Sequence, residues 1–359
     1  MKQLFSDLIE FSTTSKNPSQ INSCFDYVES VFSETPFVVQ RFNQNGSPSL
    51  IATSQNTKSP KVILQAHLDV VPAKDDFYKL TEKGGKYFGR GVYDMKFAAA
   101  CFLQLAKELG SDCALYDFGI MFSSDEEIGG ENGVKYILDK GYGSQVCILP
   151  DGGNDWKIET SSNALWIITV TSDGVSAHGS RPWEGENAIN NLIDFINDVH
   201  DHFEEQKPHS NSITVSKIHG GEAVNQVPER AQAVLDMRFL NGDEYEENKI
   251  VIEKLAIKHD LNIETYAVVQ ARDIDVSLPQ IKDFLEIGES VIGQPINTTH
   301  SFGASDACFF AEHNIPTIVI RPPGGAAHSS TEWLDIKGLD QFYEVIKAYI
   351  IETTRIKNP

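Results

Sequence analysis

The sequence predicts an α/β fold, in which a main domain with a mixed sheet flanked by helices carries an inserted, ferredoxin-like α+β domain. Short apolar strands alternate with amphipathic helices in the N-terminal part of the chain and again near its C-terminus, which is typical of a layered α/β core. Between these parts the elements follow the order β-α-β-β-α-β, which is the order of a ferredoxin-like sandwich. At 359 residues the chain is also long for a single core, so two domains are expected.

The first part opens with two helices, because apolar residues recur at helical spacing from Leu4 to Phe11 and, after the break at Asn17-Pro18, from Phe25 to Phe32. Apolar runs then predict strands at 37–40, 50–53, 62–65, 118–122 and 146–149, and helices at 98–109 and 134–138.

The inserted part has predicted strands at 164–171, 213–218, 231–239 and 263–269, and predicted helices at 188–203 and 247–259. A helix at 281–292, a strand at 317–320 and a helix at 339–351 return to the α/β pattern. The main domain is therefore expected at 1–162 and 272–359, and the inserted domain at 163–271.

The composition restricts the possible partners. With 30 basic and 51 acidic residues, the net charge of −21 disfavours nucleic acids and anionic membrane surfaces. The N-terminus lacks a signal-peptide pattern, and no apolar run approaches membrane-spanning length. The five scattered cysteines are interpreted as reduced core residues, which predicts a cytoplasmic location.

The run VILQAHLDVVP, residues 62–72, predicts a buried strand that ends in His67 and Asp69. On an extended backbone residues i and i+2 share a face, so an imidazole and a carboxylate leave the end of a strand together, where open α/β folds bind ligands. In a metal site the imidazole would be a ligand and the carboxylate would orient it. Alternatively, the pair is a strand-end histidine beside a turn-forming aspartate.

Two further loops carry acids. Asp94 lies in GRGVYDMK, where a helix begins, so it is either an N-cap or part of a glycine-rich approach to a ligand. Asp125, Glu126 and Glu127 follow the predicted strand 118–122 and precede two glycines. Three adjacent acids raise one another's pKa unless a cation compensates them, and the alternative is a solvated acidic loop.

Seven polar residues thus follow strands or open helices in one predicted core: His67, Asp69, Asp94, Glu126, Glu127, Asp151 and His328. Two imidazoles with several carboxylates suit divalent zinc, cobalt or manganese. Two metal ions that share one carboxylate need about five protein ligands, which leaves one acid free to move a proton during hydrolysis.

Seven motifs, in order from about Gln65 to Trp333, resemble those of the acetylornithine deacetylase, succinyl-diaminopimelate desuccinylase and aminoacylase family, which also contains metal-dependent carboxypeptidases and dipeptidases. The motifs are HLDVVP, GRGVYDMK, SSDEEIGG, PDGG, SAHGSRPWEGENAI, NQVP with DMRF, and GAAHSSTEW. The resemblance implies a dinuclear-zinc α/β catalytic domain, in which cobalt or manganese could replace zinc. It also implies an inserted lid domain that mediates homodimerisation.

The resemblance also implies roles for individual residues. Asp94 would bridge two metal ions, with His67 and Asp151 completing one coordination sphere and Glu127 and His328 the other. Asp69 would orient His67, and Glu126 would be the general base that activates water and passes its proton to the leaving nitrogen.

In the inserted domain, His178 would be an oxyanion donor that reaches the partner subunit's site, unless it is merely an exposed loop histidine. Asn225 and Arg238 would bind substrate, since a guanidinium suits a carboxylate, although an arginine in a strand can also be a solvated edge residue. Gly303, in FGASDA, resembles a substrate-facing glycine.

The expected function is hydrolysis of the amide bond of a small N-acyl amino acid or short peptide with a free carboxylate. Alternatives are a dipeptidase or carboxypeptidase of the same family and a non-catalytic metal-binding homologue. A two-metal phosphoester hydrolase is disfavoured, because the sequence has no obvious basic cluster that would bind a phosphate. Asp151, where deacylases more often carry Glu, and Ser161-Ser162-Asn163, in place of an arginine-rich stretch, weaken an assignment to succinyl-diaminopimelate.

Overall fold

The structure, a computed structural model, describes residues 1–203 and 210–356. The chain divides into two compact units. Unit 1 comprises Met1–Thr160, Ile274–Ser301 and the chain from Ser305 onward, and unit 2 comprises Ser161–Asp273 with Phe302–Ala304. The limits expected for the inserted domain, 163–271, lie just inside those of unit 2. Among the described residues, no helix is both long enough and apolar enough for a bilayer crossing.

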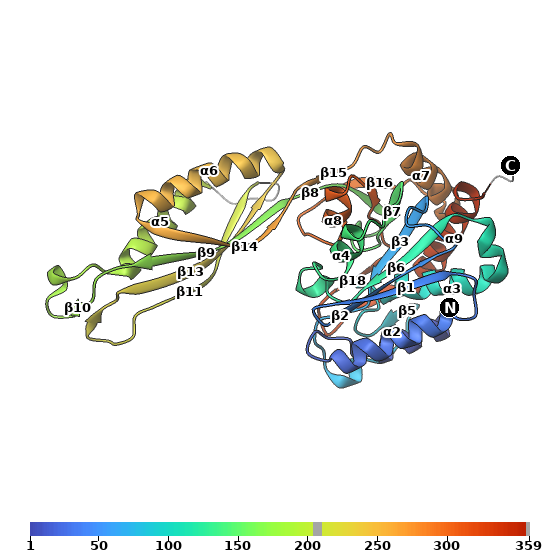
Figure 1. Cartoon of the computed structure of the whole chain (residues 1–359), viewed down its shortest axis with the longest axis horizontal. Coiled ribbons are helices and arrows are strands. Elements are labelled where there is room, and N and C mark those ends of the chain that lie inside the picture. The colour runs from blue at the N-terminus through green and yellow to red at the C-terminus, as the bar shows by residue number, and fades with distance from the viewer. Residues whose placement is uncertain (204–209, 357–359) are drawn as a thin grey trace. The chain divides into compact units, whose positions relative to one another are not determined.

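Unit 1 is built around a six-stranded mixed sheet of order β1-β2-β6-β3-β7-β17 (Figure 1). The central strand β3 is parallel to both of its neighbours, and β17 is parallel to β7, whereas β1 and β2 form an antiparallel hairpin. This arrangement confirms the predicted mixed sheet. The strands are β1 (Val38–Gln44), β2 (Ser47–Thr53), β3 (Val62–His67), β6 (Phe118–Ser123), β7 (Val146–Ile148) and β17 (Thr317–Ile318).

Helices cover both faces of this sheet, and for this reason every residue of β3 is buried. Alternate residues of a strand point to opposite faces, so Leu64 packs in one apolar cluster and Ile63 in another. The larger cluster involves α1 (Lys2–Glu10), α2 (Pro18–Phe32), α3 (Lys96–Leu109), α7 (Pro279–Ile292) and α9 (Ile336–Thr353). The smaller one involves α4 (Val134–Asp139) and α8 (Ala307–Glu312).

Several short elements were not predicted, because two to six residues show no clear periodicity. A four-stranded sheet of order β18-β19-β5-β4 and a three-stranded sheet of order β15-β8-β16 contain most of them. The strands are β4 (Thr81–Lys83), β5 (Lys86–Phe88), β8 (Lys157–Ser162), β15 (Arg272–Asp273), β16 (Asn297–Ser301), β18 (Gly324–Gly325) and β19 (Trp333–Asp335). The 3-10 helices are η1 (Asp75–Phe77), η2 (Gly110–Leu115), η3 (Glu126–Ile128) and η4 (Pro182–Glu184).

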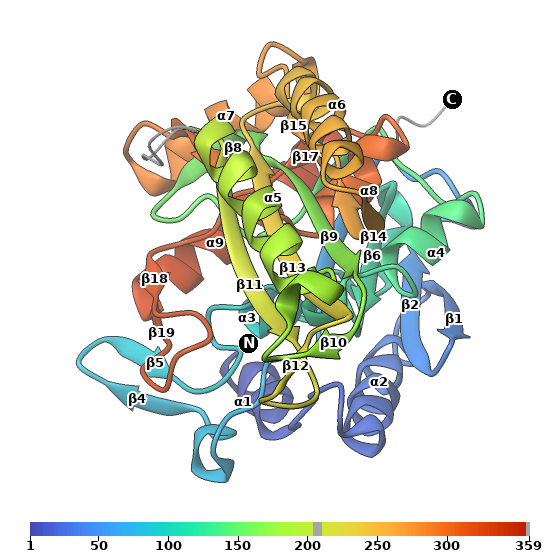
Figure 2. The same cartoon turned by 90° about the vertical axis from the view of Figure 1, so that its left-hand side faces the viewer.

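Unit 2 contains an antiparallel sheet of order β11-β13-β9-β14 with two helices, α5 and α6, that share its apolar cluster (Figure 2). Every second residue of β13 is buried in this cluster, from Ala231 to Phe239. The order of elements confirms the predicted ferredoxin-like sandwich. They are β9 (Ala164–Asp173), α5 (Ala188–His202), β11 (Ser212–Gly220), β13 (Arg230–Phe239), α6 (Gly242–Lys258) and β14 (Leu261–Val269), with a small hairpin of β10 (Ala177–His178) and β12 (Gln226–Val227).

The predicted start of α6 at residue 247 was wrong. The helix begins at Gly242 because the side chain of Asn241 caps it, accepting a hydrogen bond of 2.9 Å from the N–H of Glu244. The acidic first turn, Asp243 and Glu244, is also favourable at the positive end of the helix dipole.

Candidate metal centre

His67 ends β3 as a buried side chain whose ring is fixed from one side. Its Nδ1 lies 3.0 Å from the backbone oxygen of Asp69 and 3.5 Å from the Asp69 carboxylate. This leaves Nε2 directed at Asp94, 3.2 Å from Oδ1. Asp69 also accepts the N–H of Glu127 at 3.0 Å, so it connects the end of β3 to the acidic loop. A simple turn-forming aspartate would not need these contacts.

Asp94 does not cap a helix, because α3 begins only at Lys96 and the N-cap position is Met95. Its carboxylate instead lies between two imidazoles. Oδ1 is 3.2 Å from His67 Nε2, and Oδ2 is 3.1 Å from His328 Nε2. The two oxygens of one carboxylate thus face histidines that come from distant parts of the sequence. Such a carboxylate can bridge two cations.

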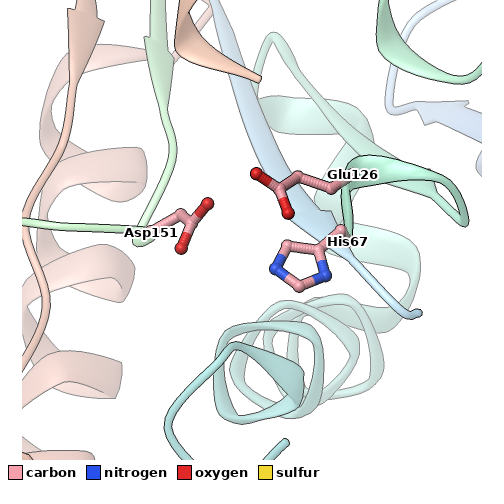
Figure 3. Close-up of side chains that lie close together, drawn as sticks. All are labelled: His67, Glu126 and Asp151. Atoms are coloured by element: carbon pink, nitrogen blue, oxygen red, sulfur yellow. The ribbon is translucent and has the colours of Figure 1, made fainter. Parts of the chain in front are cut away.

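The remaining acids complete two groups of candidate ligands. Ligand atoms of His67, Glu126 and Asp151 lie within 4.8 Å of one another, and so do those of Asp94, Glu127 and His328. Figure 3 shows the first group, with the carboxylates of Glu126 and Asp151 and the ring of His67 pointing toward one another. In the second group His328 Nε2 is 3.2 Å from Glu127 Oε2. The structure therefore brings together all the candidate ligands that the sequence singled out in unit 1.

The electrostatics of the cluster fit divalent cations. Burial and the nearby Asp94 raise the pKa of Asp151 to about 7, and burial and Asp151 raise the pKa of Glu126 well above its usual value. Burial opposes ionisation of Asp94, but hydrogen bonds with His328 and His67 hold its pKa well below the usual range. Protons thus compensate the crowded negative charge, and cations bound by the same nitrogen and oxygen atoms would replace them.

Asp125, the first of the three consecutive acids, is shielded from solvent and supports the loop. It is buried, and its Oδ2 accepts the N–H groups of Asn132 at 2.7 Å and Gly133 at 3.1 Å. These bonds close the loop that carries Glu126 and Glu127. The alternative of a solvated acidic loop was therefore wrong, because only an ordered loop can direct two neighbouring carboxylates into different ligand groups.

The sequence analysis missed the charged residues Arg321, which is partly buried, and Glu332, which is fully buried. Arg321 follows β17, with its guanidinium 4.1 Å from the ring centre of Tyr93 and Nη1 3.8 Å from Asp151 Oδ1. Glu332 is fully buried and bonds the backbone beside Asp94. The sequence offered two signals: Arg321 follows a predicted strand, and Glu332 lies inside the motif GAAHSSTEW. Neither residue could be distinguished from an ordinary charged residue on the surface.

The candidate residues of the inserted domain belong to unit 2, and two of them lie together. His178 in β10 pairs with β12 beside Asn225, whose backbone oxygen accepts the N–H of Gly179 at 2.7 Å. Arg238 lies near the C-terminal end of β13, which begins at Arg230. At 3.4 Å per residue, Arg238 is about 27 Å along the strand from Arg230. Gly303 is an exposed residue of the segment Phe302–Ala304.

Arg238 has a partner of its own. Its Nε and Nη2 donate to the two carboxylate oxygens of Asp236, at 2.7 and 3.0 Å. The two side chains share a face of β13 at spacing i, i+2. One edge of the guanidinium is therefore occupied, and a substrate carboxylate would have to use the other edge or displace Asp236.

Histidines and carboxylates gathered at one edge of a helix-covered mixed sheet are typical of a metal-dependent hydrolase. The sequence profile of Peptidase family M20/M25/M40 matches residues 63–352. The chain belongs to this family, which confirms the resemblance seen in the motifs and the expectation of metal-dependent amide hydrolysis.

Two relatives that match over nearly their whole length are named as desuccinylases. A probable succinyl-diaminopimelate desuccinylase of Staphylococcus epidermidis is 25% identical, with 97% of each chain covered. A succinyl-diaminopimelate desuccinylase of Rickettsia canadensis is 26% identical, over 96% of this chain and 97% of the other.

Among solved structures, a Staphylococcus aureus tripeptidase has a TM-score of 0.79 at 20% identity, covering 97% of this chain and 96% of the other. An M20 family metallo-carboxypeptidase of Sulfolobus solfataricus has a TM-score of 0.77 at 18% identity, covering 98% and 99%. At these identities the structural likeness supports the fold and leaves the substrate open.

Proposed function

We propose that this chain hydrolyses the amide bond of a small N-acyl amino acid or short peptide with a free carboxylate, using two divalent ions, preferably zinc. The observation that carries this proposal is the position of Asp94, with one carboxylate oxygen facing His67 and the other facing His328. We assign His67, Asp94 and Asp151 to one ion and Asp94, Glu127 and His328 to the other. Cobalt or manganese would suit the same ligands.

Two bound cations would supply Lewis acidity to the amide carbonyl and to the attacking water. The protein's own part is proton transfer and orientation. Burial and the charge of Asp151 raise the pKa of Glu126 well above its usual value, so this carboxyl takes up a proton more readily than an ordinary glutamate and can return it to the leaving nitrogen. Asp69 holds the His67 ring by Nδ1, which keeps Nε2 directed at Asp94.

We further propose that unit 2 is a lid that mediates homodimerisation and that His178 donates a hydrogen bond to the developing oxyanion in the partner's site. A backbone N–H can only donate, and the N–H of Ser180 lies 3.2 Å from His178 Nδ1. Nδ1 is therefore the acceptor, and the proton of the neutral ring is on Nε2. An exposed Nε2–H is the group that this role requires. Asn225, Arg238 and Gly303 would contact the substrate.

A dipeptidase or carboxypeptidase is the second candidate. It is favoured by Asp151, which several peptidase branches carry, and by Ser161-Ser162-Asn163 in place of an arginine-rich stretch. The named desuccinylase relatives favour the deacylase. We also propose a reducing compartment such as the cytoplasm, because none of the five cysteines, each within the described residues, forms a disulfide.

A substrate panel separates these activities. The purified chain, loaded with zinc, cobalt or manganese, is assayed on N-acetyl and N-succinyl amino acids, on dipeptides, and on the same compounds with the carboxylate converted to carboxamide. Release from the acyl compounds but not from dipeptides supports the deacylase, and the reverse supports the peptidase. The proposal requires the carboxamides to react poorly. A metal-loaded protein that cleaves none of the amides would refute it and favour a non-catalytic homologue.

A further inference from the structure

Glu332 is a fully buried carboxylate that receives four hydrogen bonds from one loop. Its Oε1 accepts the backbone N–H groups of Tyr93 at 2.9 Å and Asp94 at 3.1 Å. Its Oε2 accepts the N–H of Gly91 at 3.2 Å and Nη1 of Arg90 at 2.5 Å. The carboxylate therefore fixes the backbone on which the Asp94 side chain is mounted.

Arg90 makes a second connection between the same two segments. It is 3% exposed, and its Nη2 donates to the backbone oxygen of Ser329 at 3.3 Å, next to His328. A buried carboxylate is costly unless it is paired and hydrogen-bonded, and here Arg90 supplies the countercharge. Removing either partner would leave an uncompensated buried charge.

These contacts join the segment that carries Asp94 to the segment that carries His328, and both side chains must be positioned together to hold one cation. Asp94 and His328 are far apart in sequence, yet Asp94 Oδ2 lies 3.1 Å from His328 Nε2. His328 has φ of +64°, a conformation that L residues rarely adopt, so its backbone is held by its surroundings. Gly91, with φ of +82°, has no room for a side chain, because an added Cβ would lie 2.9 Å from Val70. Glu332 bonds the amide of Asp94 and stands four residues after His328 in the same segment.

We propose that Glu332, charge-paired with Arg90, is a positioning residue that sets Asp94 against His328 and thereby sets the affinity of the cation held by Asp94, Glu127 and His328. The inference rests on the proposed metal-ligand roles of those three residues. Glu332 itself touches neither the cation nor the substrate. Groups that orient metal ligands typically change metal affinity by 10–100-fold when they are replaced.

The test is zinc titration of the metal-free, full-length protein by calorimetry, which reads affinity and stoichiometry without reference to activity. E332Q keeps the shape of the side chain but replaces one acceptor oxygen by an NH₂ group and removes the charge. We expect one of the two zinc ions to bind 10–100-fold more weakly, with unchanged far-UV circular dichroism. The matched control is D335N, because Asp335 lies three residues away and also accepts a backbone N–H, that of Gly338 at 2.7 Å. It caps α9 and should lower the melting temperature without changing zinc affinity.

Each outcome decides between the claims. Wild-type zinc affinity in E332Q, or an equal loss in D335N, would overturn the positioning role. If E332Q does not fold, R90K decides in its place. Lysine keeps the charge but cannot reach both Glu332 and Ser329 as the guanidinium does, so unchanged affinity in R90K would also overturn it. D94N tests the underlying proposal separately: if D94N binds zinc normally, the ligand assignment itself is wrong.

Discussion

Replacing Glu126 by Gln distinguishes a general base from a metal ligand. The question arises because the carboxylate of Glu126 lies within 4.8 Å of ligand atoms of both His67 and Asp151, so its position alone permits either role. Glutamine has nearly the same shape but cannot accept the proton. If Glu126 is the base, E126Q should retain two bound zinc ions and lose turnover.

The expected loss follows from the chemistry of a single proton transfer. A positioned general base contributes about 10²–10⁴-fold, which is about 3–5 kcal/mol of transition-state stabilisation. Because this interaction is made only in the transition state, kcat and kcat/KM should fall together while KM stays nearly constant. Zinc affinity should fall by no more than about tenfold, less than the 10–100-fold typical of losing even an orienting group.

The assay combines zinc titration with initial rates on the best substrate of the panel. E127Q is the matched control, because Glu127 is the next residue and lies 3.2 Å from His328 in the other ligand group. It should lose affinity for one zinc ion. The reasoning is refuted if E126Q binds a single zinc ion, which would make Glu126 a ligand, or if it turns over at the wild-type rate.

Three further predictions concern zinc binding and the stability of the fold. G91A should weaken zinc binding, because the added Cβ would lie 2.9 Å from Val70. G84A also places alanine at positive φ, but in open space, and should bind zinc normally. E108Q should destabilise the fold at pH 7 by less than about 1 kcal/mol. Lys347 and Tyr343 donate to Glu108 and lower its pKa below 4.5, so its contribution is present above that pH and is lost as the pH falls through the folded-state pKa; chemical denaturation at pH 7 and pH 3 should show the difference disappear. Chelation should destabilise the wild type by about 2.7 kcal/mol for each zinc site, relative to zinc at 100 times the dissociation constant of that site, measured as a lower melting temperature, and should destabilise D94N less.

The fold could be predicted because burial leaves a periodic trace in the sequence. The strand at Val62 is apolar on both faces, since helices cover both sides of it, and β13 alternates because only one of its faces is buried. The short strands and 3-10 helices were missed because they are stabilised by contacts between residues far apart in the sequence, such as the pairing of Trp333 with Phe88. The N-cap of α6 at Asn241 was a local signal that was overlooked.

The candidate ligands could be predicted because strands and loops of a layered α/β core bring their ends together. His67 and Glu127 stood out as imidazole and carboxylate beside apolar strands. The supporting residues could not be predicted, because nothing in the sequence distinguishes Glu332 and Arg321 from charged residues on the surface. Only the folded structure shows that Glu332 is buried and that Arg321 lies beside Asp151. The contact between Arg238 and Asp236 could not be predicted from their spacing alone, because an arginine at the same position can also be free. Only the side-chain positions show the hydrogen bond.

An anomalous difference map from crystals of the 359-residue chain grown with zinc tests directly whether Asp94 joins two metal ions. We expect two peaks, about 3.5–4 Å apart. One should lie beside the Asp94 oxygen that faces His67, and the other beside the oxygen that faces His328. A single peak, or peaks that do not contact Asp94, would contradict this expectation.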